Sequence, residues 1–316
     1  MVCAGSTGIP AIQRLVWDSQ RHWIGHRNIA GGRVSSVTPG ILSRSDRKEP
    51  MSNAATPVPP TAASRSVLVT GASGGIGAAV ARRFADAGAS VAVHYAANRD
   101  GAEETLRSLS GTGHVLVTGD IGEPDGATDI VGSALEQLGQ LDVLVCNAAV
   151  APSPSNRHVI GETSFADWSA AFRRMVDVNL LGAANLAWAV ATHLIERGAP
   201  GAIVNVGSRG AFRGEPEYPA YAASKAGLHA LGQSLAVALA PHAISITSVA
   251  PGFVATPRQL EKLDGPDGDA LRAQSPFGRV GTPEEVAAAV FWLASPEAAW
   301  SSGAILDANG ASYLRS

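Results

Sequence analysis

From position 66 onward, the chain alternates short apolar runs with segments whose apolar residues recur at helical spacing. Val67-Leu68-Val69 is an apolar run of the kind that fills a buried parallel strand. After a glycine-rich turn, Ile76, Val80 and Phe84 recur along one face of a predicted helix. This strand, turn and helix unit then repeats along the rest of the chain.

The same pattern predicts the remaining elements. Strands are expected at 90–95, 114–118, 141–146, 202–206 and 244–249, with 304–306 as a candidate last strand. Helices are expected at 127–138, 221–239 and 284–293, and 168–195 is expected as one long helix. Such alternation implies a doubly wound parallel sheet with right-handed crossovers. The predicted fold class is therefore α/β of the Rossmann type, with residues 65–316 as a single catalytic domain.

Residues 1–64 differ from the rest because they show no sustained apolar period and end in the breaker-rich run Pro57-Val58-Pro59-Pro60-Thr61. We interpret them as a disordered extension, or as a stretch translated from a start codon set too early, with Met51 as the natural first residue. A targeting segment is the alternative, because basic residues outnumber acidic ones here. A secretory signal would need an apolar region that this segment lacks.

The glycine-rich turn Thr70-Gly71-Ala72-Ser73-Gly74-Gly75-Ile76-Gly77 lies between a predicted strand and a predicted helix. Glycines in that position let the backbone approach a pyrophosphate, and the helix N-terminus supplies free N–H groups and a positive dipole end. The turn alone does not specify an enzyme class, because methyltransferases and flavoproteins use similar turns.

The end of the second predicted strand bears on the choice of dinucleotide. An acid that accepts the 2′-hydroxyl of NAD is expected about 20 residues after the turn. This strand ends instead at Tyr95, and Asn98 and Arg99 follow, where they could meet a 2′-phosphate. NADP(H) is therefore favoured over NAD(H), although Asp100 lies close by and a solvated surface loop explains Arg99 equally well.

Tyr221 and Lys225 are four residues apart in a predicted helix, which places them on one face. A phenol is a poor base at neutral pH, and a neighbouring ammonium favours the phenolate. With only four tyrosines and three lysines in the chain, this spacing is an uncommon coincidence. Tyr218 is a competing base, but Ala222 stands where its lysine would be.

Composition excludes several function classes. The 316 residues are 46% hydrophobic with a net charge of −3, which gives no electrostatic case for nucleic-acid or membrane-surface binding. Cys3 and Cys146 offer no disulfide framework, and no metal-ligand spacing is present, so we expect no metal and a cytoplasmic location. We expect no apolar stretch long enough to cross a bilayer.

Several motifs in order resemble the short-chain dehydrogenase/reductase family, in particular its single-domain enzymes of about 250 residues. The resemblance covers residues 65–316 and includes the turn at 70–77, Asp120-Ile121, the segment Asn147-Ala148-Ala149, Asn179, Ser208 thirteen residues before Tyr221, and Pro251-Gly252 with Thr256. The family's pattern has glycine where Ala149 stands and often asparagine where Cys146 stands.

The resemblance implies roles for these residues. Tyr221 would exchange a proton with the substrate oxygen, and Ser208 would orient the carbonyl. Lys225 would hold the nicotinamide ribose and lower the pKa of the tyrosine. Asn179 would anchor a water chain that supplies protons. The implied cofactor-binding residues are Thr70, Gly71, Ser73, Gly75, Ile76, Gly77, Tyr95, Asn98, Arg99, Asp120, Ile121, Asn147, Ala148, Ala149, Tyr221, Lys225, Pro251, Gly252, Val254 and Thr256.

The resemblance implies an NAD(P)(H)-dependent oxidoreductase acting on a carbonyl or secondary alcohol. A 3-oxoacyl-[acyl-carrier-protein] reductase-like activity ranks first among substrates, and sugars, steroids and other secondary alcohols stay open. Candidate pocket segments are 150–154, 209–218 and the lid-like stretch 253–276. The family also implies a homotetramer or dimer. A cofactor-sensing regulator on the same fold is the alternative, and such a protein would usually lack the tyrosine or the lysine.

Overall fold

Seven parallel strands form one sheet in the computed structural model, which describes residues 65–315. The strands are β1 (Ser66–Val69), β2 (Ser90–Tyr95), β3 (Val115–Thr118), β4 (Val143–Cys146), β5 (Gly201–Val206), β6 (Ile244–Pro251) and β7 (Ile305–Ala308). Their spatial order is β3-β2-β1-β4-β5-β6-β7, and all six neighbouring pairs are parallel. The predicted doubly wound α/β fold is confirmed. The predictions for residues 1–64 lie outside the described residues.

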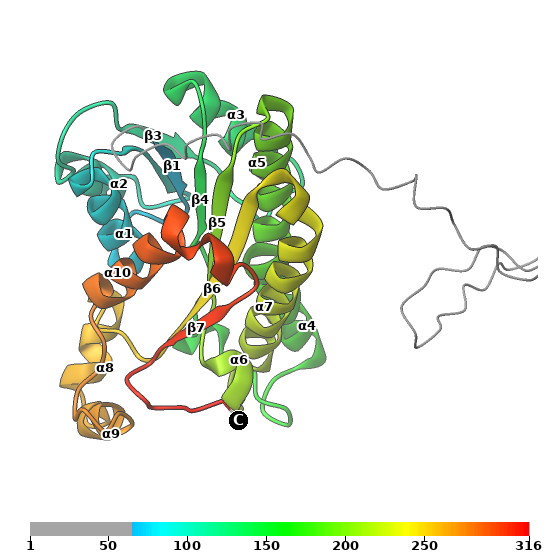
Figure 1. The fold of residues 1–316 in the computed structure, drawn as a ribbon. Helices are drawn as coiled ribbons and strands as arrows, with labels where there is room; N and C mark the ends of the chain where they lie inside the picture. Colours follow the sequence, from blue (N-terminus) through cyan, green and yellow to red (C-terminus); the bar gives the residue numbers. More distant parts are fainter. Residues whose placement is uncertain (1–64, 316) are drawn as a thin grey trace, which may run out of the picture. The chain divides into compact units, whose positions relative to one another are not determined.

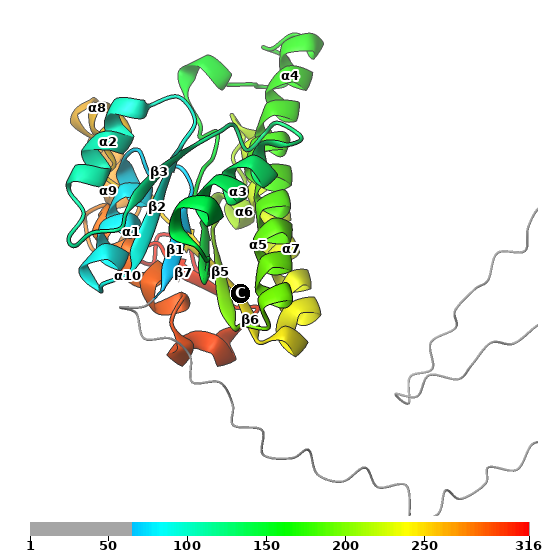
Figure 2. The same cartoon turned by 90° about the horizontal axis from the view of Figure 1, so that it is seen from above.

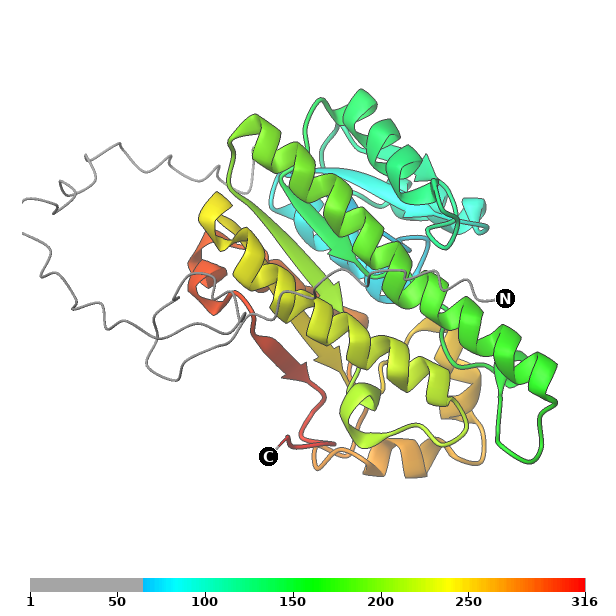
Figure 3. The ribbon, with the colours of Figure 1, turned by 90° about the vertical axis from the view of Figure 1, so that its right-hand side faces the viewer.

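Helices cover both faces of this sheet (Figures 1 and 2). One face carries α1 (Gly75–Asp86), α2 (Arg99–Arg107) and α10 (Pro283–Leu293), and the other carries α3 (Gly126–Leu138), α4 (Phe165–Val176), α5 (Ala183–Arg197) and α7 (Pro219–Leu239). Figure 3 shows α5 and α7 running side by side across the second face. Three short helices, α6 (Gly210–Arg213), α8 (Leu260–Asp264) and α9 (Gly268–Ala273), lie toward the edge where the strands end (Figure 1).

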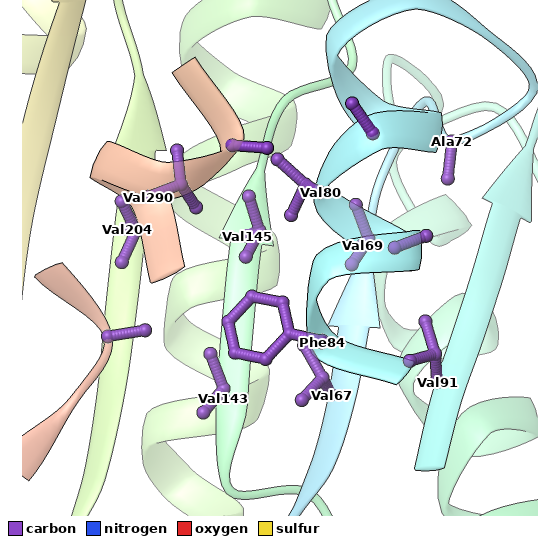
Figure 4. Close-up of a cluster of buried hydrophobic side chains, with 14 of the residues drawn as sticks. Val67, Val69, Ala72, Val80, Phe84, Val91, Val143, Val145, Val204 and Val290 are labelled. Carbon is purple, nitrogen blue, oxygen red and sulfur yellow. The ribbon is translucent and has the colours of Figure 1, made fainter. Parts of the chain in front are cut away.

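The apolar periodicity of α1 explains how it packs. Val80 and Phe84 are fully buried and lie over valines of β1 and β4 (Figure 4). The Phe84 ring also meets Phe291 of α10 edge to face, with 5.2 Å between centroids. Burying side chains of this size stabilises the fold by about 1.5–3 kcal/mol each relative to exposure. This packing holds the N-terminus of α1 against the end of β1, where the glycine-rich turn lies.

The segment predicted as one helix at 168–195 is interrupted. A π-helical stretch, Asp177–Gly182, separates α4 from α5, so the α-helical ladder is not continuous. A π-turn widens the helix locally and is common at functional sites. Apolar periodicity could not reveal it, because the flanking turns keep the same buried face.

Helices α2 and α6 were not predicted, since α2 is polar and α6 has only four residues. Arg99 therefore begins a helix and does not lie in a loop. The lid-like stretch 253–276 also contains α8 and α9. The predicted strand and helix ends differ from the observed ones by up to three residues, and helix ends in particular fray.

We expected no segment long and apolar enough to span a membrane, and one helical segment does meet these two criteria. The helical segment Phe165–Arg197, with its π-helical stretch included, has 33 residues. An 18-residue window of it reaches a mean hydropathy of 1.4, and half of that window is buried. Its buried residues, such as Leu186, Val190 and Leu194, pack against the sheet in the second core cluster. Packing on the sheet accounts for their apolar character.

Candidate active site

The predicted site residues gather at the carboxyl ends of the strands. The chain order reverses between β1 and β4, and ligands of open α/β sheets bind at such a switch point. The glycine-rich turn follows β1, Asn147 follows β4, Ser208 follows β5 and Gly252 follows β6. Parallel pairing therefore brings residues from distant parts of the chain to one edge.

The glycines of the turn are required by close approach and by backbone conformation. Gly71 and Gly75 have φ values of +65° and +55°, which L side chains rarely adopt. A Cβ on Gly77 would lie 2.3 Å from the carbonyl oxygen of Gly71 and 2.6 Å from Nδ2 of Asn147. By contrast, a Cβ on Gly74 would meet nothing within 4 Å.

This contrast yields a matched pair of variants. Gly77→Ala is expected to destabilise the protein by about 1–3 kcal/mol, because backbone atoms must move to admit the methyl group. It should also weaken NADPH binding by about tenfold or more, since the turn that faces the pyrophosphate shifts. Urea unfolding and NADPH fluorescence titration measure the two effects. Gly74→Ala is the control and should change neither substantially; equal effects from both variants would contradict the close-approach argument.

Thr70 and Asn147 join the β1 turn to the β4 turn. The Thr70 hydroxyl donates to the Val145 carbonyl and accepts from the backbone N–H groups of Asn147 and Ala148, at 3.0–3.1 Å. The Asn147 side chain donates to the carbonyls of Thr70 and Gly71 at 2.9 and 3.1 Å. Both predicted cofactor residues thus shape the backbone of the turn and direct their hydrogen bonds to protein.

A nicotinamide dinucleotide fits the residues at this edge. The Thr256 hydroxyl is buried with no hydrogen-bond partner among the described residues. Thr256 also lies against the turn, because a Cβ on Gly75 would be 3.1 Å from its methyl carbon. An unpaired buried hydroxyl is costly, and the carboxamide of a bound nicotinamide could satisfy it. Gly252 packs on Asn309, and Val254 bridges to Gly281, so the rest of this loop is held in place.

The adenosine end differs in detail from expectation. Asn98 caps α2 by accepting from the Gly101 N–H at 3.1 Å, and its amide reaches the Ser73 carbonyl at 3.5 Å. Arg99 is exposed and pairs with Glu103 at 2.8 Å. Tyr95 is buried in the first core cluster, so its ring is a core component.

Asp120 and Ile121 follow β3. Asp120 accepts from the Gly122 N–H and pairs with Arg174 at 2.8 Å. Partial burial by itself would raise the pKa of the Asp120 carboxyl, but these two contacts outweigh it and the pKa is lowered. Ile121 is buried against Gly182 of the π-helical segment, whereas Ile76 packs partly on the first core cluster.

His94 is a contributor that the sequence did not reveal. Its Nδ1 accepts from the Gly71 N–H at 3.2 Å, and its Nε2 lies 3.0 Å from the Gly119 carbonyl. Burial lowers the pKa of His94, which favours the neutral ring that this pairing requires. His94 therefore connects the glycine-rich turn to the loop after β3. Its place at the end of a buried strand was the only available signal.

Ser208, Tyr221 and Lys225 meet where β5 faces α7. Lys225 is 3% exposed, and its Nζ donates to the Val206 carbonyl at 2.8 Å. The Ser208 hydroxyl accepts from the Gly210 N–H at 3.0 Å. Burial raises the pKa of the half-buried Tyr221 phenol, while a side-chain hydrogen bond with Ser208 acts in the opposite direction.

The pKa shifts of this pair depart from expectation. We expected Lys225 to lower the pKa of Tyr221, but the net shift is upward because burial outweighs the bond to Ser208. Burial also lowers the pKa of Lys225 to about 8. The neighbouring Cys146 thiol is buried, which raises its pKa to about 12 and makes it unreactive as a thiolate.

Asn179 joins this group through the π-helical segment. Its side chain accepts from the Val150 N–H at 2.7 Å and donates to the Val150 carbonyl and to Ser224, both at 3.1 Å. The Ser224 hydroxyl in turn donates to the Tyr221 carbonyl at 2.8 Å. The structure thus connects Asn179 to the first turns of α7 that carry Tyr221, and Ser224 is a connector that the sequence did not single out.

His158 is a second histidine that sequence patterns missed. It is fully buried, and its Nε2 accepts from the Ala220 N–H at 3.1 Å while its Nδ1 lies 2.7 Å from the Asn156 carbonyl. The first N–H groups of a helix have no partner within that helix, and Ala220 is in the first turn of α7. His158 therefore caps the helix that carries Tyr221.

Comparison with known proteins places this arrangement among oxidoreductases. A family model described as enoyl-(acyl carrier protein) reductase matches residues 71–310. L-rhamnose 1-dehydrogenase (NAD(P)(+)) from Sphingomonas sp. is 37% identical over 254 residues, covering 79% of this chain and 96% of that protein.

Two solved structures are similar over most of the chain. An angucycline C-6 ketoreductase with bound NADP is 31% identical with a TM-score of 0.70, covering 79% of this chain and 96% of that one. A 3-ketoacyl-(acyl-carrier-protein) reductase from Brucella melitensis complexed with NADH is 28% identical with a TM-score of 0.70, covering 80% and 100%. These similarities support use of NADP(H) or NAD(H).

Proposed function

The chain belongs to the short-chain dehydrogenase/reductase family, and from this premise we propose that Ser208, Tyr221, Lys225 and Asn179 form its catalytic centre. The protein is an NAD(P)-dependent oxidoreductase. The observation that carries the proposal is the meeting of Tyr221, Lys225 and Ser208 at the strand edge that also holds the glycine-rich turn.

The proposed roles follow from the contacts of each group. A bound nicotinamide supplies or accepts the hydride. During reduction Tyr221 donates its phenolic proton to the carbonyl oxygen, and the raised pKa keeps that proton in place at neutral pH. Ser208 donates a hydrogen bond to the same oxygen and stabilises its developing charge. Lys225 would hold the ribose of a bound nicotinamide, and Asn179 holds the Val150 backbone and the Tyr221 turn in register.

A carbonyl or secondary alcohol is the proposed substrate class, with a 3-oxoacyl-[acyl-carrier-protein] reductase-like activity as the first candidate. Support comes from the similarity to a 3-ketoacyl-(acyl-carrier-protein) reductase structure. The regulator alternative finds no support, since the tyrosine and lysine that such proteins usually lack are both present.

The experiment is to mix the full chain with NADPH or NADH and a panel of ketones, including an acetoacetyl thioester, and to follow the nicotinamide absorbance. We expect ketone-dependent oxidation of the reduced cofactor. A protein that binds NADPH, oxidises it with no ketone of the panel and reduces NADP+ with no secondary alcohol would contradict the proposed catalytic centre.

The preference for NADP(H) is proposed on Arg99 and has its own test. Arg99→Ala should raise the KM for NADPH by about tenfold and leave that for NADH nearly unchanged, because an Arg–phosphate contact is charge-assisted. Glu103→Gln, which frees Arg99 from its pairing, is the matched control and should not raise the KM for NADPH. Equal use of both cofactors by the unaltered protein would contradict the preference.

We further propose a homo-oligomer, either a tetramer or a dimer, in the cytoplasm. Exposed apolar side chains on neighbouring helices support assembly: Phe165 is 84% exposed, Trp188 65% and Val237 79%. The free buried thiol of Cys146 fits a reducing compartment.

A further inference from the structure

A cavity of about 250 Å³ lies beside the proposed active site. Its walls come from the residue after Ser208, the loop after β6, the segment 271–281, the start of α10 and the end of β7. Apolar side chains line part of it, including Phe253, Leu271 and Val280, and Arg209 is the polar group of interest. None of the four proposed catalytic residues lines this cavity.

Arg209 is a buried cation with neutral partners. It is 5% exposed, and its guanidinium donates to the Ser312 hydroxyl and to the side-chain oxygen of Gln274. No carboxylate of the described residues lies within ion-pair distance of it. Burial lowers the pKa of Arg209 and the nearby Arg213 acts in the same direction, whereas the charge of Glu215, outside ion-pair distance, acts in the opposite one. Buried charges in proteins are normally paired, so the buried Arg209 guanidinium indicates a site for an anionic group.

The carboxylates around the cavity are already engaged. Glu285, which lines it, pairs with Arg279 at 2.6 Å. Asp307, which also lines it, pairs with Arg315 at 2.7 Å.

Outside the cavity, Glu215 pairs with Arg213 at 3.3 Å. The cavity lining thus holds two arginines and two carboxylates, and both carboxylates are paired with other arginines. Arg209 is the lining cation that has no carboxylate within ion-pair distance among the described residues.

The dimensions and walls select the kind of ligand. A dry cavity of about 150 Å³ can hold a benzene ring, so this one has room for a small ring or short chain with one polar head. A planar carboxylate matches the guanidinium fork in shape and charge. We propose that this cavity is an accessory site for a small monocarboxylate, with the carboxylate on Arg209 and the apolar body against Phe253, Leu271 and Val280.

Such a ligand would act on the neighbouring lid-like segment. Arg209 directly follows Ser208, whereas Gln274 belongs to the turn after α9, and Ser275 donates to the Gly310 carbonyl at 2.6 Å. A carboxylate on Arg209 would compete with Gln274 and Ser312 for the same donors. The site is independent of the hydride chemistry, so its test uses binding alone.

Benzoate is the probe, and benzamide is its neutral control of nearly the same shape. Isothermal titration of the full chain without cofactor should show benzoate binding at least about tenfold more tightly than benzamide. Arg209→Gln should remove that difference, and Arg209→Lys should keep part of it. Arg107→Gln is the control and should leave benzoate affinity within about threefold, because Arg107 is exposed in the last turn of α2 and does not line the cavity.

A second variant keeps the test decisive if Arg209→Gln fails to fold. Val280→Phe fills the cavity from its apolar wall and should weaken benzoate binding by about tenfold or more while Arg209 stays in place. Equal binding of benzoate and benzamide, or unchanged benzoate affinity in the folded variants, would overturn the proposal. A changed assembly of Arg209→Gln in sedimentation, with unchanged benzoate affinity, would assign the charge to a subunit contact and also overturn it.

Discussion

Replacing Tyr221 with Phe is expected to lower ketone-dependent turnover by about 10²–10⁴-fold, the range that a positioned acid or base contributes. The variant loses only the phenolic hydroxyl, so the ring still fills its place at the start of α7. NADPH binding, measured by fluorescence titration, should therefore stay within about threefold of the unaltered protein. The combination of lost turnover and retained binding separates proton transfer from a general disturbance of the site.

Tyr218→Phe is the matched control. Tyr218 lies just before α7, with its ring 6.1 Å from that of His158. It has Ala222 where Tyr221 has Lys225. Turnover should fall by less than about tenfold, because this hydroxyl has no part in the proposed proton transfer. Substantial turnover in Tyr221→Phe, or its loss in Tyr218→Phe alone, would move the acid to Tyr218.

Replacing Lys225 with Met is expected to lower turnover by about 10²-fold or more and to weaken cofactor binding. The reason is that Lys225 carries the only buried ammonium among the described residues. Met keeps the length and apolar stem of the side chain, so the packing within α7 is largely preserved. Steady-state kinetics and NADPH titration measure the two effects. Lys262→Met, on the exposed surface of α8, controls for loss of a lysine and should leave both unchanged.

The lowered pKa of Lys225 predicts that cofactor binding and protein stability both depend on pH. Its pKa falls from 10.5 to about 8 in the folded protein, so the ammonium is present below pH 8 and lost above it. Cofactor binding that depends on this charge should weaken as pH rises through about 8, and Lys225→Met should lack that step.

Between about pH 8 and pH 10.5, Lys225 is protonated in the unfolded chain and neutral in the folded protein. The free energy of unfolding should therefore rise with pH through this range. Urea unfolding of Lys225→Met should lack this increment. A parallel pH dependence in both proteins would contradict the lowered pKa.

Local patterns were sufficient for the parallel sheet and for most of the site. Strand runs such as Val67-Leu68-Val69 are apolar because both faces of a parallel sheet are covered, and this shows in the sequence without any tertiary information. Tyr221 and Lys225 share one helix, so their spacing alone placed them together. The glycines of the turn were likewise readable, because few other residues suit those backbone conformations.

Contacts between distant segments could not be read in this way. Asn179, in the π-helical segment, donates to Ser224, which lies 45 residues further along the chain. His94 and His158 each hydrogen-bond a backbone group more than twenty residues away. Such bonds depend on how the chain folds back, which residue spacing does not encode.

The sequence by itself determined which residues stand at the ends of the strands, because the strand pattern and the motifs are local. The tertiary structure alone decided how these residues are charged and paired. Burial raises the pKa of Tyr221 where the Tyr–Lys spacing predicted a fall, and folding buries Arg209 beside a cavity with neutral hydrogen-bond partners. Desolvation depends on every segment packed around a group, and that environment exists only once the whole chain is folded.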